Sequence, residues 1–243
     1  MTESTAVADR TLVGNRWVLV GGVGYLLEWV AIIWVGALGI GETVVRGTPL
    51  EDLRDSYVGH QDALTTMAGW FAVVLLFRIL LFIGLRQALA DSGYRHPLMD
   101  FAVAAAAVSV TLEIASYGLG GAASSLAEKG DGDAMLLLLD QAAAGVNLML
   151  AGGLGVAITC AAYCMWRSQL FPTVLNVIGL VSGLAIIGAQ LTVAPSMQAL
   201  FDILFAFPLL FWVWMLWAGV LCWRRTPRHD RVGSVGGPGR SPG

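Results

Sequence analysis

The chain has 243 residues, of which 57% are hydrophobic and 13% charged, and its net charge is −3. Soluble domains carry about 25% charged residues, so this composition excludes an ordinary soluble protein and predicts an integral membrane protein. The net charge gives no indication of nucleic-acid binding. The sequence shows no glycine-rich phosphate loop and no metal-ligand spacing, so we expect no cofactor.

Six stretches are long and apolar enough to cross a bilayer, which takes about 20 residues. They cover residues 17–40, 65–86, 99–121, 135–165, 173–193 and 199–223. The sequence therefore predicts an all-α fold, a bundle of six transmembrane helices in one domain over 17–223. Residues 1–16 form an N-terminal segment, and we expect residues 224–243 to form a disordered basic tail. The first stretch is too long for the hydrophobic region of a signal peptide, so we interpret it as a span.

The first two spans carry charged residues within apolar surroundings. Glu28 lies near the middle of the first span, with Tyr25 one turn earlier and Trp29 beside it. The loop that follows, residues 41–64, is acidic, and we expect a short helix at the membrane surface within it. Arg78 lies near the middle of the second span.

The third and fourth spans carry two further carboxylates. Glu113 lies in the outer half of the third span, with Tyr117 one turn later. Asp140 lies near the outer end of the fourth span, and Asn147 lies two turns further along on the same face. Gln190 in the fifth span has a similar predicted depth.

The last spans contain residues that predict packing and shape. Gly179 and Gly183 form a G-x-x-x-G pair, which lets two helices approach closely. Pro208 interrupts the hydrogen-bond ladder of the sixth span, and we expect a kink there. Cys160 and Cys164 are one turn apart, but no histidine lies near them in the sequence, so we interpret them as packing residues.

The distribution of basic residues predicts that both termini lie in the cytoplasm. With this orientation ten basic residues lie inside, three lie outside, and Arg78 lies within a span. The inner residues are Arg10, Arg16, Arg86, Arg95, Arg167, Arg224, Arg225, Arg228, Arg231 and Arg240. The outer residues are Arg46, Arg54 and Lys129.

Charged residues inside a bilayer predict a polar site, because each costs roughly 2.5–3.5 kcal/mol at the bilayer centre. Such residues face the bundle interior and usually pair, so we expect Arg78 to pair with Glu28 or Glu113. One arginine cannot neutralise every carboxylate, so we expect Glu28 and Glu113 to share a cavity in the outer half of the bundle. The side chains expected at this site as ligand-binding groups are Tyr25, Trp29, Arg78, Tyr117, Asp140 and Asn147.

Three segments resemble a known family. They are FRILLFIGLRQAL in the second span, WRSQLFPTVLNVIGLVSG between the fourth and fifth spans, and DILFAFPLLFWVWMLWAGVLCW at the last span. They are similar to the six-helix bacterial membrane proteins grouped as domain of unknown function 4386. The closest match is the inner turn Arg167-Ser168-x-Leu170-Phe171-Pro172. The resemblance covers most of residues 17–223; it implies the six-helix fold and a bacterial cytoplasmic membrane, and it implies no activity.

The residues favour a membrane protein that binds a hydrophobic or lipid-like small molecule, with membrane lipid as its other partner. An alternative is an intramembrane enzyme that cyclises a polyprenyl chain, as terpene cyclases do. Glu28 or Glu113 would then be the catalytic acid, and aromatic rings would stabilise the carbocation. A small proton-coupled permease and a structural subunit are further alternatives, although the sequence has no internal repeat of the kind common in transporters. The sequence leaves the ligand and the oligomeric state open.

Overall fold

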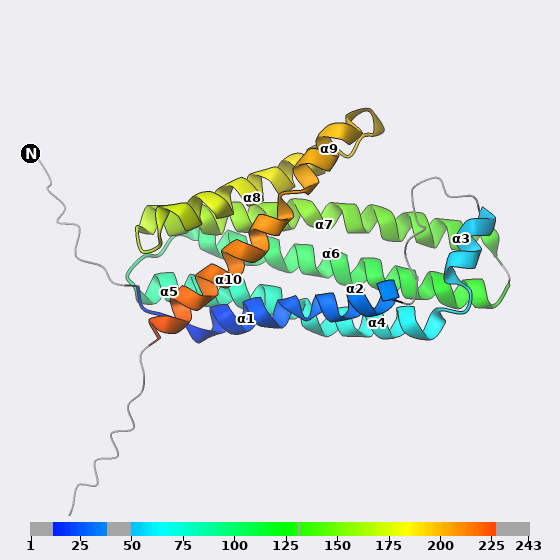
Figure 1. Ribbon diagram of the computed structural model, residues 1–243, viewed down its shortest axis with the longest axis horizontal. Helices are drawn as coiled ribbons and strands as arrows, with labels where there is room; N and C mark the ends of the chain where they lie inside the picture. Colours follow the sequence, from blue (N-terminus) through cyan, green and yellow to red (C-terminus); the bar gives the residue numbers. More distant parts are fainter. Residues whose placement is uncertain (1–11, 38–49, 131, 227–243) are drawn as a thin grey trace, which may run out of the picture.

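The computed structural model describes residues 12–37, 50–130 and 132–226. Within these residues the fold is all-α and contains no strand (Figure 1). Six helical spans are long and apolar enough to cross a membrane, so the prediction of a six-helix transmembrane bundle is confirmed. They are Arg16–Trp34, Gln61–Asp91, Pro97–Glu128, Asp133–Ser168, Thr173–Leu191 and Gln198–Arg224.

Several spans are built from more than one helix. The helices are α1 (Arg16–Leu26), α2 (Glu28–Ala37), α3 (Leu50–Tyr57), α4 (Gln61–Val74), α5 (Leu76–Asp91), α6 (Pro97–Glu128), α7 (Asp133–Ser168), α8 (Thr173–Leu191), α9 (Gln198–Phe205) and α10 (Pro208–Arg224). A 3₁₀ turn, Pro195–Met197, precedes α9. Helix α3 confirms the short helix expected in the loop 41–64. Most of the predicted terminal segments, 1–11 and 227–243, lie outside the described residues.

The helix termini follow local sequence signals. The side chain of Asn15 accepts a hydrogen bond from the Trp17 N–H and so caps α1. At the start of α6, His96 caps the Leu98 N–H and Pro97 occupies the first helical position, where its missing donor costs nothing. Helix α7 ends at Ser168 and is followed by Gln169, which adopts a left-handed conformation with φ of 56°.

The first, second and sixth spans are each broken into two helices. The break between α9 and α10 confirms the kink expected at Pro208. The breaks at Leu27 and Leu75 were not predicted, because leucine is a strong helix former. At the first of them the Trp70 indole N–H donates to the Leu27 carbonyl at 2.9 Å, in addition to the backbone N–H of Val30. Tertiary contacts therefore support this break.

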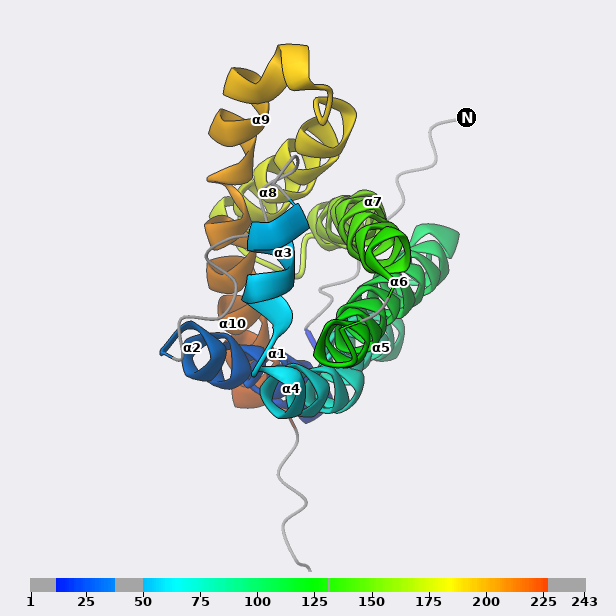
Figure 2. The ribbon, with the colours of Figure 1, turned by 90° about the vertical axis from the view of Figure 1, so that its right-hand side faces the viewer.

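The spans form a closed ring. Helix α1 packs against α5 and α10, α10 against α8, α8 against α7, α7 against α6, and α6 against α4 and α5. Helix α3 contacts the ends of α6 and α7 and lies across one end of the bundle (Figure 2). We call this the α3 end. The opposite end carries the C-terminus of α10 and is the arginine-rich end, with Arg86, Arg95, Arg167, Arg224 and Arg225.

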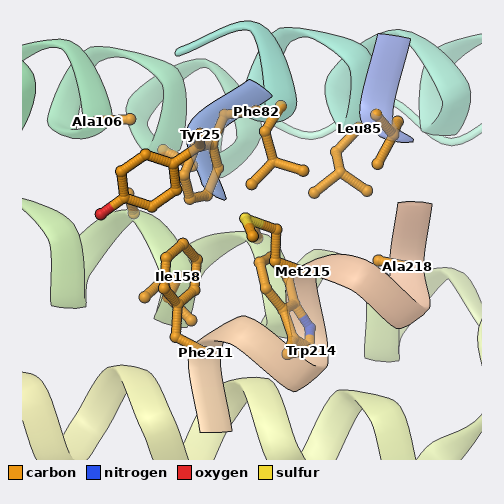
Figure 3. Packing of buried hydrophobic residues seen from close by; sticks show 14 of the residues in the cluster. Tyr25, Phe82, Leu85, Ala106, Ile158, Phe211, Trp214, Met215 and Ala218 are labelled. Carbon is orange, nitrogen blue, oxygen red and sulfur yellow. The ribbon is translucent and has the colours of Figure 1, made fainter. Parts of the chain in front are cut away.

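The core fills the centre of the ring, mainly toward the arginine-rich end. Trp214, Phe82, Leu85, Ile158 and Phe211 are among its most buried side chains (Figure 3). Their packing closes this half of the bundle and places the polar groups nearer the α3 end.

Close helix contacts occur at the predicted glycine pair. A Cβ atom on Gly183 would lie 2.3 Å from Thr159 Oγ1, and one on Gly179 would lie 2.5 Å from Trp214 Nε1. The prediction that these glycines allow close helix packing is therefore confirmed. The outward surface is apolar: Leu191 is 75% exposed and Leu209 is 68% exposed, as suits contact with lipid.

Candidate functional site

A buried arginine organises the polar interior of the bundle. Arg78 follows the break at Leu75 and is 0% exposed. Its guanidinium forms an ion pair with Glu113 of α6, and its Nη1 donates to Ser109 Oγ at 2.9 Å. The expected pairing of Arg78 is thus confirmed, with Glu113 as the partner.

The Tyr25 ring lies against the same guanidinium, at 4.5 Å from the arginine Cζ to the ring centre. This is a cation–π contact in a water-excluded setting, where such contacts are strongest. On its other side Tyr25 stacks on Trp212 of α10, with 4.8 Å between ring centres. Trp29 meets the edge of Trp212 at 5.9 Å and is 40% exposed, so it lies toward the outside of the bundle.

Glu28 is the first residue of α2, immediately after the break at Leu27, and it is 5% exposed. Glu28 shares a hydrogen bond with the Tyr25 hydroxyl and interacts electrostatically with Arg78. No ion pair of Glu28 within 4.0 Å occurs in the described part of the chain.

Tyr25, Glu28, Arg78, Ser109 and Glu113 together form what we call the Arg78 cluster. It contains two carboxylates and one guanidinium, and Glu113 is the carboxylate that the guanidinium contacts directly. The cluster therefore has one carboxylate, Glu28, without a direct cationic partner among the described residues.

Three adjoining cavities lie between the Arg78 cluster and the α3 end. Their volumes are about 280, 300 and 280 Å³. Asn147 lines all three, Tyr117 lines the first and second, and Asp140 lines the first and third. We call the three cavities together the vestibule. Its polar lining residues include Tyr57, Glu113, Ser116, Tyr117, Asp140, Gln141, Asn147, Gln190 and Gln198.

The second cavity contacts the Arg78 cluster through Glu113 and has a mainly apolar wall. That wall includes Leu148, Leu150, Ala151, Leu154, Ile186 and Ala189. Within it, Gln190 Oε1 is a buried atom with no hydrogen-bond partner in the described residues. A buried acceptor without a partner is unusual, so this atom is open to a donor from outside the protein.

Helix α3 covers the first cavity. Tyr57 of α3 donates a 2.9 Å hydrogen bond to Asp140, which is 3% exposed. Burial and the negative charge of Asp140 raise the pKa of Tyr57, so its phenol stays protonated and remains a donor. Helix α3 is held further by the ion pair between Arg54 and Asp133.

The structure divides the residues expected at one site between two neighbouring places. Tyr25, Glu28 and Arg78 belong to the Arg78 cluster, whereas Tyr117, Asp140 and Asn147 line the vestibule. Glu113 belongs to both. Glu113 lines the second cavity of the vestibule, whereas Glu28 lines none of the three, so they are not the shared cavity expected for these two carboxylates.

Some lining residues were not predicted. Tyr57 lies in a polar loop of the sequence, and only its contact with Asp140 reveals its place in the vestibule. Phe201 of α9 lines the second and third cavities. Within the described residues, no group of three or more histidine, cysteine, aspartate and glutamate side chains is placed to hold a metal ion.

Comparison with known proteins does not indicate a family: no protein-family model, no curated protein and no solved structure matches the chain.

Proposed function

We propose that the protein is an integral membrane protein that binds a lipid-like small molecule in the vestibule. The observation that carries this proposal is that the lining of the three adjoining cavities changes from polar under α3 to apolar toward the core. Asp140, Asn147 and Tyr57 line the part under α3, while Leu154 and Ile186 line the part toward the core. A ligand with a polar head and an apolar body would match both parts, as pockets for small molecules commonly do.

The polar groups favour a ligand head that donates hydrogen bonds or carries positive charge. The Asp140 carboxylate accepts from Tyr57 and at 3.3 Å from Gln141, and a carboxylate can accept further bonds. In the second cavity, Gln190 Oε1 is a further acceptor without a partner among the described residues, and it would meet a donor placed further along the ligand. We therefore propose an amine or hydroxyl head, with the apolar body passing along the second cavity.

A variant that fills the vestibule tests this proposal. Ala144 lines the first and third cavities, and Ala144→Phe would occupy their space without replacing a buried core residue. Ala115→Phe is the matched control, since Ala115 is an exposed residue of α6 that lines none of the three cavities. The probes are dodecylamine and farnesol, with dodecanoate as an anionic comparison, and the readout is the melting temperature of detergent-purified protein.

We expect dodecylamine or farnesol to raise the melting temperature of the wild type and of Ala115→Phe, because a ligand that binds only the folded state stabilises it. The shift should be absent in Ala144→Phe, and dodecanoate should give none. An equal shift in Ala144→Phe would place the probe elsewhere and overturn the proposal.

The alternative of an acid-catalysed cyclase has less support. A catalytic acid must be free to meet its substrate, but the Glu113 carboxylate is already engaged in an ion pair with Arg78. The role would then fall to Glu28, which does not line the vestibule cavities. Binding requires neither residue to give up a proton, and it is therefore the function that the site supports best.

We further propose that the protein lies in a bacterial cytoplasmic membrane with both termini in the cytoplasm. Support comes from the arginine-rich end, where Arg86, Arg95, Arg167, Arg224 and Arg225 gather, since basic residues are enriched on the cytoplasmic side. Membership of the family named domain of unknown function 4386 is likewise a proposal. It is supported by the turn between α7 and α8 that carries the closest resemblance.

A further inference from the structure

A fourth cavity lies at the arginine-rich end, remote from the vestibule. Its volume is about 260 Å³, and it is formed by the end of α5, the turn after it and the start of α6. We call it the α5–α6 pocket. Its lining residues are Arg86, Ala90, Tyr94, Arg95, His96, Met99 and Asp100, and none of them lines the vestibule.

The charges of this pocket are mainly positive. Arg86 and Arg95 line it with Asp100 as the one carboxylate of the lining. Asp100 is already in an ion pair with Arg86 through Nε. A guanidinium has five N–H donors in a planar fork, so the two terminal nitrogens of Arg86 remain for another acceptor. The guanidinium of Arg95 contributes a second planar set of N–H donors.

The side chains of His96 and Tyr94 also present hydrogen-bond donors in the pocket. His96 Nδ1 accepts from the Leu98 N–H at 3.2 Å, so the neutral imidazole carries its proton on Nε2. The ring is also held between Tyr94 at 6.1 Å and Tyr163 at 6.3 Å. Burial raises the pKa of Tyr94, so its phenol is a donor at neutral pH.

We propose that the α5–α6 pocket binds a phosphate group. Arginine forks match phosphate oxygens geometrically, and the start of the 32-residue helix α6 adds a partial positive charge at the same place. The pocket lies at the ends of two spans, where they meet the membrane boundary. The bound phosphate group can therefore belong to a phospholipid headgroup or be a free phosphate ion. Basic pockets between transmembrane helices commonly bind anionic lipid heads.

The test uses detergent-purified full-length protein, with phosphatidylglycerol, phosphatidylcholine and inorganic phosphate as separate probes at constant ionic strength. Lipid adducts counted by native mass spectrometry and the melting temperature are the readouts. The variants are Arg95→Gln and the double variant Arg86→Gln/Arg95→Gln. Arg54→Gln is the matched control, because Arg54 also forms an exposed ion pair, with Asp133, but at the α3 end.

We expect the wild type and Arg54→Gln to bind phosphatidylglycerol more tightly than phosphatidylcholine. The double variant should bind phosphatidylglycerol about tenfold more weakly, since it loses both guanidinium forks. The affinity of Arg95→Gln for phosphatidylglycerol should lie between that of the wild type and that of the double variant. Because Arg86 and Asp100 side chains are 55% and 61% exposed, the fold should persist, and an unchanged vestibule response to dodecylamine or farnesol would report this.

The response to inorganic phosphate distinguishes a phospholipid site from a site for the free phosphate ion. A lipid site predicts that phosphate alone produces little stabilisation, while phosphatidylglycerol gives a clear shift that the double variant loses. If phosphate alone stabilises the wild type and phosphatidylglycerol acts no better than phosphatidylcholine, the pocket binds the free ion. If the double variant binds both probes as the wild type does, the pocket is not a phosphate site, and its arginines only orient the bundle.

Discussion

Two of the four buried charged residues in the described part of the chain, Glu28 and Arg78, lie next to breaks in helices. Glu28 begins α2, and Arg78 lies three residues after the break at Leu75. A charge inside a bilayer is stabilised by a partner, by backbone dipoles or by both. Arg78 has an ion pair, a hydrogen bond and an aromatic ring, whereas Glu28 has the Tyr25 hydroxyl and the more distant charge of Arg78. The two residues are therefore accommodated by different means.

Arg78→Ala should destabilise the protein strongly, because it leaves Glu113 buried without its cation. Removing one partner of a buried pair typically costs about 3–5 kcal/mol. Thermal unfolding of detergent-solubilised protein would show a large fall in melting temperature. The pairing also predicts which second change restores stability. Arg78→Ala/Glu113→Gln should recover more than Arg78→Ala/Glu28→Gln, and the reverse order would contradict the assigned partner.

Tyr57→Phe should loosen α3, because Asp140 then loses a buried hydrogen bond at a cost of about 1–3 kcal/mol. The measurement is hydrogen exchange of the α3 amides, with Tyr163→Phe as a control at a tyrosine that is 40% exposed. Faster exchange only in Tyr57→Phe is expected. Equal exchange in both variants would mean that the contact with Asp140 does not hold α3.

The same contact predicts a pH dependence. The pKa of Tyr57 is raised in the folded state above its usual value of 10.0, so the folded protein retains a proton that the unfolded chain loses. The stability contributed by Tyr57 is complete below about pH 10 and is lost as the pH rises above that value. Tyr57→Phe should therefore lose less stability than the wild type between neutral and strongly alkaline pH. A pH profile of the melting temperature for both proteins would measure the difference.

At the scale of elements, glycines decide how closely the helices approach. Gly183 of α8 lies against Thr159 and the Gly155 carbonyl of α7, and a Cβ atom there would meet the backbone N of Thr159 at 2.7 Å. Backbone cannot move aside as a flexible side chain can. The contact between α7 and α8 therefore depends on the absence of a side chain at this position.

Gly183→Ala should separate α7 from α8 and cost roughly 1–3 kcal/mol, as overpacking of a close contact does. Gly118→Ala is the control, because a Cβ atom on Gly118 meets no atom within 4 Å. Alanine favours a helix over glycine by about 1 kcal/mol, so the control should be neutral or more stable in thermal unfolding. Equal behaviour of the two variants would argue against close packing of α7 and α8.

At the scale of the whole molecule, helix lengths show that the bundle extends beyond the bilayer. Helix α7 has 36 residues, which corresponds to about 54 Å at about 1.5 Å per residue. The hydrocarbon core is about 30 Å thick. Since α7 ends beside Arg167 at the arginine-rich end, its excess length lies toward α3. The opening of the vestibule under α3 is therefore expected near or above the headgroups, and its apolar part within the bilayer.

The proposed orientation predicts the activity of reporter fusions. Alkaline phosphatase is active only outside the cytoplasm, so fusions after residue 55 or 130 should be active and a fusion after residue 230 should be inactive. A green fluorescent protein series at the same three positions should give the opposite pattern. An active phosphatase at residue 230 would reverse the assigned sides. The six-helix fold would be unaffected, because it does not depend on the sign of the orientation.

The sequence alone was enough to predict the six spans, the short helix α3, the break at Pro208 and the close approach at Gly183. These are local properties, since a span needs about 20 apolar residues, proline lacks a backbone donor and glycine lacks a side chain. The cost of a buried charge also limited the partner of Arg78 to two carboxylates. Local composition could not decide between these two.

Only the tertiary structure determined how the helices are rotated and which side chains meet. Arg78 and Glu113 are 35 residues apart, and Tyr57 and Asp140 are 83 apart, so no local pattern relates either pair. The break at Leu27 has no breaker residue at its position, and its carbonyl accepts an additional hydrogen bond from Trp70 of another span. Glu28 and Glu113 have similar predicted depths, yet only Glu113 lines the vestibule. Depth follows from position along one helix, whereas a shared site depends on the faces that several helices turn toward one another.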